Sequence, residues 1–313
     1  MSNVTKRSRL RNILSIVLLL CLFIVGYRYF ASHWDETKDL QLIRPSLFLV
    51  VAICFAISIM LRGFFTLAVL RAVDVRLSFF ESFSLSMVGT MVNNLLPARG
   101  GAGVRGLYLK RAHQLPVAYF ASTMAAYFLF DTLVGPLLGL LALLLLAISG
   151  ETPRMDLIVV LTALAFTSAF IIFLLPSISH SYKGKIAEFS LRILEGWKRM
   201  RASKSILLVA VLTSLGAPLS AVVGFYSGFH AFGVEISWIG ALLLTSSYVI
   251  GGWVTLTPGG VGFQEALGIY FGMVLQIDQV ELLSILLCIR LVRVATSVLV
   301  GLPCLWRMRR NVL

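Results

Sequence analysis

Residues 256–266 read Leu256-Thr257-Pro258-Gly259-Gly260-Val261-Gly262-Phe263-Gln264-Glu265-Ala266, which places a proline, three glycines and a carboxylate in otherwise almost wholly apolar sequence. Apolar segments flank this stretch at residues 239–254 and 266–275. A helix cannot run unbroken through Pro258 and the two glycines after it, because proline removes a backbone donor and glycine costs helix stability. In hydrocarbon, a broken backbone is tolerated only where protein or a water-filled cavity satisfies its polar groups. The stretch therefore predicts a helical hairpin whose tip is buried inside a membrane protein.

A weaker copy of this stretch lies at residues 96–106, Leu96-Pro97-Ala98-Arg99-Gly100-Gly101-Ala102-Gly103-Val104-Arg105-Gly106. The glycines of the two copies align at a constant offset: Gly100, Gly101 and Gly103 with Gly259, Gly260 and Gly262. We expect the chain to break at both places, at 97–103 and at 258–262. The copies differ in charge, because the first carries arginines and the second carries Glu265 in the first turn after the break, where a helix favours negative charge. Paired interrupted segments in two halves of a membrane protein point to a transport site.

The composition identifies an integral membrane protein. The chain has 313 residues, of which 58% are hydrophobic and 13% charged, and its mean hydropathy is +0.92; a soluble domain of this size would be far more polar. In a soluble protein the net charge of +13 would suggest a nucleic-acid partner. Here the charge follows the expected membrane sides, so we expect no nucleic acid. The four cysteines lie inside apolar runs and are expected to be packing residues rather than disulfides.

The positive-inside rule orders the spans. Basic residues before an uncleaved first helix place the N-terminus in the cytoplasm, and Arg307, Arg309 and Arg310 place the C-terminus there too. Basic clusters bracket the first hairpin and acidic residues bracket the second, so the hairpins should enter from opposite faces. We expect six full spans, at about 12–31, 46–70, 116–148, 157–175, 205–230 and 282–303.

The predicted fold is an all-α polytopic membrane protein of about six spans and two re-entrant hairpins in an inverted repeat. It forms one transmembrane domain over residues 1–313, with a first half at about 46–148 and a second at about 205–303. Between the halves, residues 177–204 interleave basic and apolar side chains. This segment is either an amphipathic helix on the inner leaflet or a plain cytoplasmic linker.

Charged residues at membrane depth carry the functional signal. Each costs about 2.5–3.5 kcal/mol at a helix centre, so each must pair or face a polar cavity. They are Arg62, Arg99, Arg105, Asp131, Glu265, Arg290 and Arg293. With Arg62 set aside as near the interface, four arginines against two acids predict a positive chamber that suits an anionic group such as a lipid phosphate. Alternatively, Asp131–Arg105 and Glu265–Arg290 are structural pairs that hold the hairpins, and both interpretations can hold at once.

The sequence contains no catalytic constellation. Its histidines are dispersed, no metal-ligand spacing occurs, and no nucleotide-binding P-loop is present. Gly101-x-Gly103-x-x-Gly106 formally matches a dinucleotide fingerprint but lacks the strand and the βαβ unit that such a site needs. We therefore expect no enzyme activity, no cofactor and no metal site.

These motifs resemble the flippase-like transmembrane region of lysylphosphatidylglycerol synthases, a family that also has stand-alone bacterial and archaeal members. The family's second motif, roughly T-P-G-G-x-G-x-x-E-A, is similar to residues 257–266, and its first, roughly P-x-R-x-G-E-x-x-R, is similar to residues 97–105. An acid downstream looks like Asp131, and an arginine in the last helix looks like Arg290. Ala102 stands where the family usually has glutamate, which makes the site more positive. We expect no soluble aminoacyl-transferase domain to follow, so the resemblance implies the translocating half.

The leading hypothesis is a lipid translocase that moves an anionic phospholipid or a polyprenyl-phosphate-linked lipid across a bacterial cytoplasmic (inner) membrane. The expected head-group site contains Arg99, Arg105, Asp131, Gln264, Glu265, Arg290 and Arg293. One alternative is a non-transporting scaffold or accessory subunit for an envelope-lipid biosynthesis enzyme, and another is a small-anion secondary transporter. Membrane lipids are the expected partners, while the lipid species, the direction, the energy source and the oligomeric state stay open.

Overall fold

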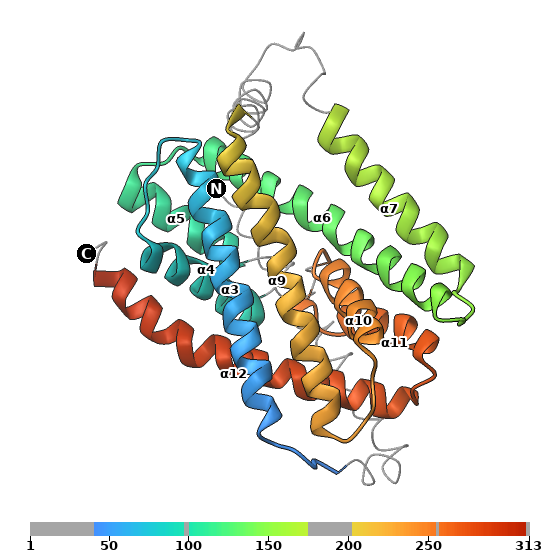
Figure 1. The fold of residues 1–313 in the computed structure, drawn as a ribbon. Helices are drawn as coiled ribbons and strands as arrows, with labels where there is room; N and C mark the ends of the chain where they lie inside the picture. Colours follow the sequence, from blue (N-terminus) through green and yellow to red (C-terminus); the bar gives the residue numbers. More distant parts are fainter. Residues whose placement is uncertain (1–40, 97–99, 175–201, 255–256, 311–313) are drawn as a thin grey trace, which may run out of the picture.

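The computed structural model describes residues 41–96, 100–174, 202–254 and 257–310, and in these ranges every regular element is helical. The helices are α3 (Leu47–Arg71), α4 (Phe79–Leu95), α5 (Gly100–His113), α6 (Val117–Ile148), α7 (Met155–Leu174), α9 (Lys204–Ala231), α10 (Trp238–Gly251), η2 (Pro258–Gly260), α11 (Phe263–Gly272), η3 (Met273–Leu275) and α12 (Gln279–Arg310), shown in Figure 1. The first predicted span, at 12–31, and nearly all of the 177–204 segment lie outside the described residues.

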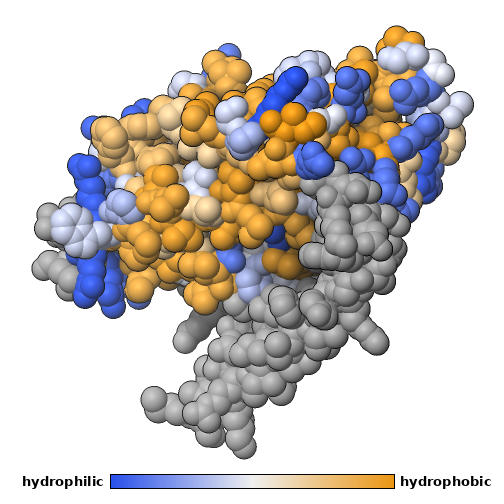
Figure 2. Space-filling view, turned by 90° about the horizontal axis from the view of Figure 1, so that it is seen from below, coloured by the Kyte–Doolittle hydropathy of each residue, from blue (hydrophilic) through white to orange (hydrophobic). Residues whose placement is uncertain are grey.

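Four of the described helices, α3, α6, α9 and α12, are long and apolar enough to cross a membrane. Their positions agree with the predicted spans, except that α12 begins before and ends beyond the expected 282–303. The helix at the predicted fourth span, α7, is a shorter apolar helix. Figure 2 shows apolar side chains over much of one face of the described part, with hydrophilic side chains gathered toward its ends. The chain is thus a polytopic, all-helical membrane protein.

The two halves repeat each other element by element. Each has a long helix, two shorter helices and a second long helix, α3-α4-α5-α6 and α9-α10-α11-α12. The first long helices end in the same turn, since the Val75 N–H donates to Leu70 O (3.0 Å) and the Val234 N–H to Phe229 O (3.2 Å). α3 and α9 pack side by side and run in opposite directions (Figure 1). The two halves therefore share one order of elements, and their first long helices are antiparallel.

The repeat extends to the starts of the other helices. Ser78 and Ser237 each cap the first helix of a hairpin, accepting a hydrogen bond from a backbone N–H three residues later. The second long helices, α6 and α12, have 32 residues each. A glutamine in the left-handed backbone region precedes each of them, Gln114 (φ 54°) and Gln276 (φ 55°). These matching turns fix where each hairpin begins and ends.

The two hairpin tips are built differently. In the second hairpin the glycines form the break, because Gly259 (φ 60°), Gly260 (φ 70°) and Gly262 (φ 87°) adopt backbone angles that favour glycine. In the first hairpin, the prediction that the glycines form the break was wrong. Gly100, Gly101 and Gly103 lie in the first turn of α5. Pro97 and Arg99 lie outside the described residues.

The reason for Gly101 in the first hairpin is close packing rather than backbone freedom. A Cβ at Gly101 would lie 1.9 Å from the Gly89 carbonyl oxygen, so α5 can approach α4 only if this residue has no side chain. The first N–H groups of a helix have no partner within the helix, so another group must satisfy them. The Asn93 side chain does this, because its Oδ1 accepts a hydrogen bond from the Gly101 N–H at 2.8 Å.

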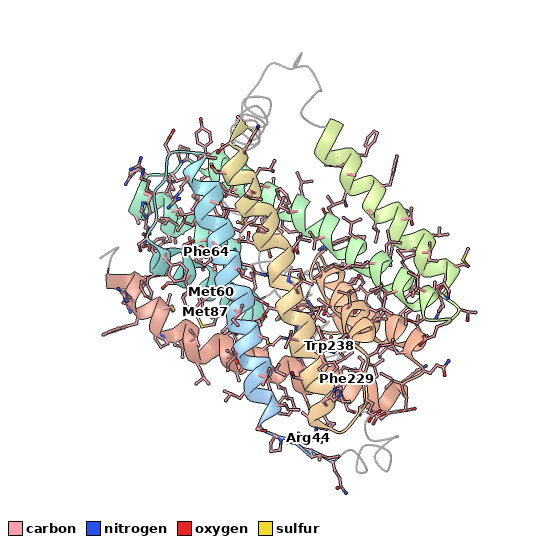
Figure 3. All side chains as sticks on the ribbon, viewed as in Figure 1. Arg44, Met60, Phe64, Met87, Phe229 and Trp238 are labelled. Atoms are coloured by element: carbon pink, nitrogen blue, oxygen red, sulfur yellow. The ribbon has the colours of Figure 1, made fainter. Side chains whose placement is uncertain are left out.

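Basic and acidic residues gather at opposite ends of the helices. Leu70, Leu109 and Met308 pack together where α3, α5 and α12 end, and the basic residues of those ends are Arg71, Lys110, Arg111, Arg307 and Arg309. At the other end, mostly acidic residues flank the helices: Glu151, Asp156, Glu235, Asp278 and Glu281. Figure 3 shows Arg44, Phe229 and Trp238 toward this end, where α3 and α10 begin and α9 ends.

Candidate functional site

A cavity of about 220 Å³ lies where the two hairpins meet. Its wall is built by α3, by the end of α4 and the start of α5, by α6, by the second break with the residues on either side of it, and by α12. The polar residues of the wall are Arg62, Thr90, Asn93, Asn94, Arg105, Tyr127, Asp131, Tyr248, Thr257, Gln264, Arg290 and Arg293. Both halves of the repeat therefore contribute to one chamber.

The hairpin tips touch each other at this chamber. The Asn94 Nδ2 donates to Ser297 Oγ (3.1 Å), which joins the first hairpin to α12. The second break lies against the same asparagine, since a Cβ at Gly259 would lie 3.3 Å from Asn94 Oδ1. The tip of the first hairpin thus packs directly on the break of the second.

Arg290 is the centre of the second-hairpin side. Its Nε lies 2.8 Å from Glu265 Oε1, and both residues are buried, with 9% and 7% of their surface exposed. The Arg290 Nη2 donates to Gln264 Oε1 (2.6 Å) and to the Gly259 carbonyl (2.9 Å). The second carboxylate oxygen of Glu265 accepts from the Gly262 N–H (2.8 Å). The Glu265–Arg290 pair expected from the sequence is therefore present, and it fastens α12 to the broken segment.

Arg105 has a different partner from the one expected. Its Nη2 donates to the Ser86 carbonyl oxygen of α4 at 3.2 Å, so the guanidinium lies against the backbone of α4 rather than in the predicted pair with Asp131. Gly89 makes room for it, because a Cβ there would lie 2.0 Å from Arg105 Nε. Asp131 lies in the wall of the same cavity. Arg99 lies outside the described residues.

Two further arginines lie over aromatic rings. The Cζ of Arg293 is 3.9 Å from the centre of the Tyr248 ring, and that of Arg62 is 5.6 Å from the Tyr127 ring. A desolvated cation over an aromatic face is stabilised by about 2 kcal/mol. Setting Arg62 aside as an interfacial residue was wrong, since it lines the cavity. It lies nine residues before the end of α3, about 13 Å along the helix at 1.5 Å per residue.

The cavity has excess positive charge. Four described arginines line it, Asp131 is in its wall, and Glu265 neutralises Arg290. Three donor atoms of wall residues are buried without a hydrogen-bond partner in the described part of the chain: Arg105 Nε, Tyr127 Oη and Arg290 Nη1. Buried donors almost always have a partner, so the Tyr127 Oη and the Arg290 Nη1 favour an acceptor in the cavity, whereas the Arg105 Nε lies against Gly89. Among the described residues, no three His, Cys, Asp or Glu side chains gather as metal ligands.

Sequence reasoning missed several wall residues. Tyr127 and Tyr248 resemble ordinary core aromatics, and nothing local marks them as cavity residues. Asn93 and Asn94 did carry a signal, since two adjacent amides in an apolar segment need partners in a membrane. The breaks and buried charges were visible in the sequence, whereas the groups that surround them were not.

The base of each hairpin is held by a tyrosine and a carboxylate. In the first, Tyr108 Oη donates to Glu81 Oε1 (2.7 Å), and His113 Nε2 lies 2.6 Å from the same oxygen. In the second, Tyr270 donates to Asp156, which also pairs with Arg154. The hydrogen bonds from Arg154 and Tyr270 hold the pKa of Asp156 well below its ordinary value. Burial raises the pKa of Glu81, but the hydrogen bonds from His113 and Tyr108 outweigh burial and lower it.

Acid should loosen the base of the first hairpin. Because the folded-state pKa of Glu81 is lowered, its contribution to stability is present above the unfolded value of about 4.3 and is lost as the pH falls through the folded value. Between pH 6 and pH 3, the unfolding temperature of the wild type should therefore fall more steeply than that of Glu81→Gln. Thermal unfolding of both proteins in the same detergent tests this, and parallel curves would contradict it.

Comparison with known proteins identifies the family. No curated protein matches the chain significantly. The sequence model described as the lysylphosphatidylglycerol synthase TM region matches residues 12–301, nearly the whole chain. That match covers both hairpins, all of α3, α6 and α9, and α12 as far as residue 301. This chain belongs to the family of the lysylphosphatidylglycerol synthase transmembrane region.

Proposed function

We propose that this protein is a lipid translocase, which moves an anionic phospholipid or a polyprenyl-phosphate-linked lipid between the leaflets of a bacterial cytoplasmic membrane. The observation that carries the proposal is the arginine-lined cavity at the meeting point of the hairpins. A family of transmembrane regions named for a lipid-modifying enzyme supports a lipid as the substrate. Guanidinium groups bind phosphate through paired hydrogen bonds, which suits a lipid head group.

The size of the cavity limits which part of a lipid it can hold. Sites for whole drug-sized ligands measure about 300–1,000 Å³, so a cavity of about 220 Å³ holds a head group but not its chains. The chains would stay in the bilayer while the head group crosses. This division avoids the cost of carrying a charged group through hydrocarbon, which is the physical barrier to unassisted lipid movement.

The proposed membrane arrangement has six full spans and two re-entrant hairpins that enter from opposite faces, with both termini in the cytoplasm. The opposite gathering of basic and acidic residues supports this orientation under the positive-inside rule. Inverted repeats that meet at a central site can open alternately to the two sides by rocking one half against the other. Glu265 would compete with the lipid head group for Arg290 and would thereby release the lipid.

Reconstituted proteoliposomes test the proposal. Movement of a fluorescent anionic phospholipid across the bilayer should fall at least tenfold in Arg105→Ala and in Glu265→Gln, because one loses a head-group contact and the other the charge that competes with it. Lys110→Ala, at the exposed end of α5, is the matched control and should leave transport unchanged. Normal lipid movement in both cavity variants, with native unfolding curves, would reject the assigned roles.

The same assay separates the alternatives. A small-anion transporter would take up labelled phosphate into vesicles without moving lipid. A non-transporting scaffold would show neither activity and would tolerate charge-neutral cavity variants that fold normally. A translocase moves lipid and loses this activity with its cavity charges.

A further inference from the structure

We propose that the anionic group of the substrate binds at the N-terminal end of α5, between Arg105 and Tyr127, where it takes the place of the carboxylate that the other hairpin carries at the third position of α11. This inference rests on the proposed function and specifies it further. It names the wall of the cavity that receives the charge, and it adds Tyr127 as a ligand.

The carboxylate in question is Glu265. It is the third residue of α11, and its two oxygens satisfy the Gly262 N–H and approach Arg290 Nε. A single side chain therefore neutralises the positive end of a helix and the nearest buried arginine. Helix N-termini carry about half a positive charge together with unsatisfied N–H groups, so this is a favourable place for an anion.

The first hairpin lacks such a group. The third residue of α5 is Ala102, whose methyl group lines the cavity. Among the described residues, the Gly101 N–H donates to the neutral Asn93 Oδ1 rather than to a carboxylate. The N-terminal end of α5 therefore keeps its positive electrostatic potential. It faces the same cavity as α11, whose own N-terminal charge is compensated by Glu265.

Two polar side chains next to this end, Arg105 and Tyr127, line the cavity. Arg105 follows Ala102 by three residues, so both lie on one face of α5. The Arg105 Nε lies against Gly89 of α4, whereas the Tyr127 Oη is buried without a hydrogen-bond partner in the described part of the chain. An oxyanion in the cavity would accept from the Tyr127 hydroxyl and lie beside the Arg105 guanidinium. A carboxylate at position 102 would extend from the same wall of the cavity, which the alanine methyl lines.

The Ala102→Glu variant tests this by supplying the anion from the protein itself. The full-length protein in nanodiscs is titrated by calorimetry with dihexanoyl phosphatidic acid, a soluble short-chain lipid phosphate, and separately with inorganic phosphate. Ala102→Glu should weaken binding of the lipid phosphate at least tenfold, whereas Ala102→Gln, of the same size but uncharged, should stay within threefold. Without ligand, Ala102→Glu should also unfold at a higher temperature than the wild type.

Tyr127→Phe provides an independent variant that keeps the packing. It should weaken binding of the lipid phosphate about fivefold, while Tyr119→Phe, on the same helix but outside the cavity, should not. Equal losses in Ala102→Glu and Ala102→Gln, or unchanged binding in both Ala102→Glu and Tyr127→Phe, would overturn the proposed position. Stronger binding of inorganic phosphate than of the lipid phosphate would assign the position to a free anion.

The two proposals fail in different ways. A wild type that binds the lipid phosphate and moves lipid, with binding insensitive to residues 102 and 127, would reject the position and keep the translocase. A wild type that neither binds the lipid phosphate nor moves lipid would reject both. Transport without binding of the probe would reject the anion position alone.

Discussion

Glu265→Ala should destabilise the protein by about 3–5 kcal/mol, because it leaves Arg290 as a buried charge without its counter-charge. Arg290→Met should cost a similar amount for the converse reason. Both residues are almost fully buried, and the carboxylate also satisfies the Gly262 N–H. The double variant should lose less than the sum of the single losses by about 2 kcal/mol or more, since the second substitution removes the charge that the first exposed.

Equilibrium unfolding in mixed detergent micelles measures the four free energies of this cycle. Arg154→Ala is the matched control, because it removes an arginine from an exposed pair with Asp156 and should leave the unfolding free energy almost unchanged. Single losses that simply add would show that Glu265 and Arg290 act separately. The fastening of α12 to the second break would then lose its main support.

The long helices could be placed from the sequence because their signals are local. Apolar length and flanking charge place α3, α6 and α9 to within a residue or two of the predicted spans. The N-cap serines follow the same logic, since a cap bonds a backbone N–H three positions away. The extra length of α12 was missed because its last turns carry arginines, which hydropathy treats as the end of a span.

The two glycine clusters show where local reasoning stops. Both have the same spacing, and in sequence both indicate a break. Only the second supplies positive φ angles; in the first, Gly101 allows the close approach of a neighbouring helix. The difference depends on Gly89, which lies on the preceding helix and approaches Gly101 only after the hairpin has folded.

The buried charges were predictable for a physical reason, but their partners were not. A charge in hydrocarbon must be compensated, so Arg105, Glu265, Arg290 and Arg293 could be assigned to one polar chamber in advance. Glu265 and Arg290 did pair as expected. Arg105 instead donates a hydrogen bond to the backbone carbonyl of Ser86. Every residue has such a carbonyl, so no sequence pattern marks this one as the partner. Which acceptor lies within reach is decided by the approach of α4 and α5.

That approach should make Gly101→Ala strongly destabilising, by about 3 kcal/mol, the upper part of the range for overpacking. The added Cβ would lie 1.9 Å from the Gly89 carbonyl oxygen and 2.7 Å from Asn93 Oδ1. Neither atom can yield cheaply, because one is backbone and the other holds the end of α5. Separation of the helices would also move Arg105 away from Ser86 and deform the cavity wall.

Gly103→Ala, two residues further along the same helix, should have the opposite effect. Nothing lies within 4 Å of a Cβ at this position, and its backbone is helical. Alanine is favoured over glycine in a helix by about 1 kcal/mol, so this variant should be more stable than the wild type. Unfolding in mixed micelles compares the two.

The pair isolates the contact between helices, because the intrinsic preference for alanine is the same at both positions and cancels in the difference. A difference of about 4 kcal/mol between the variants would therefore measure the cost of separating α4 from α5. Equal stabilities would mean that the helices can move apart freely, and that Gly101 does not set the shape of the cavity.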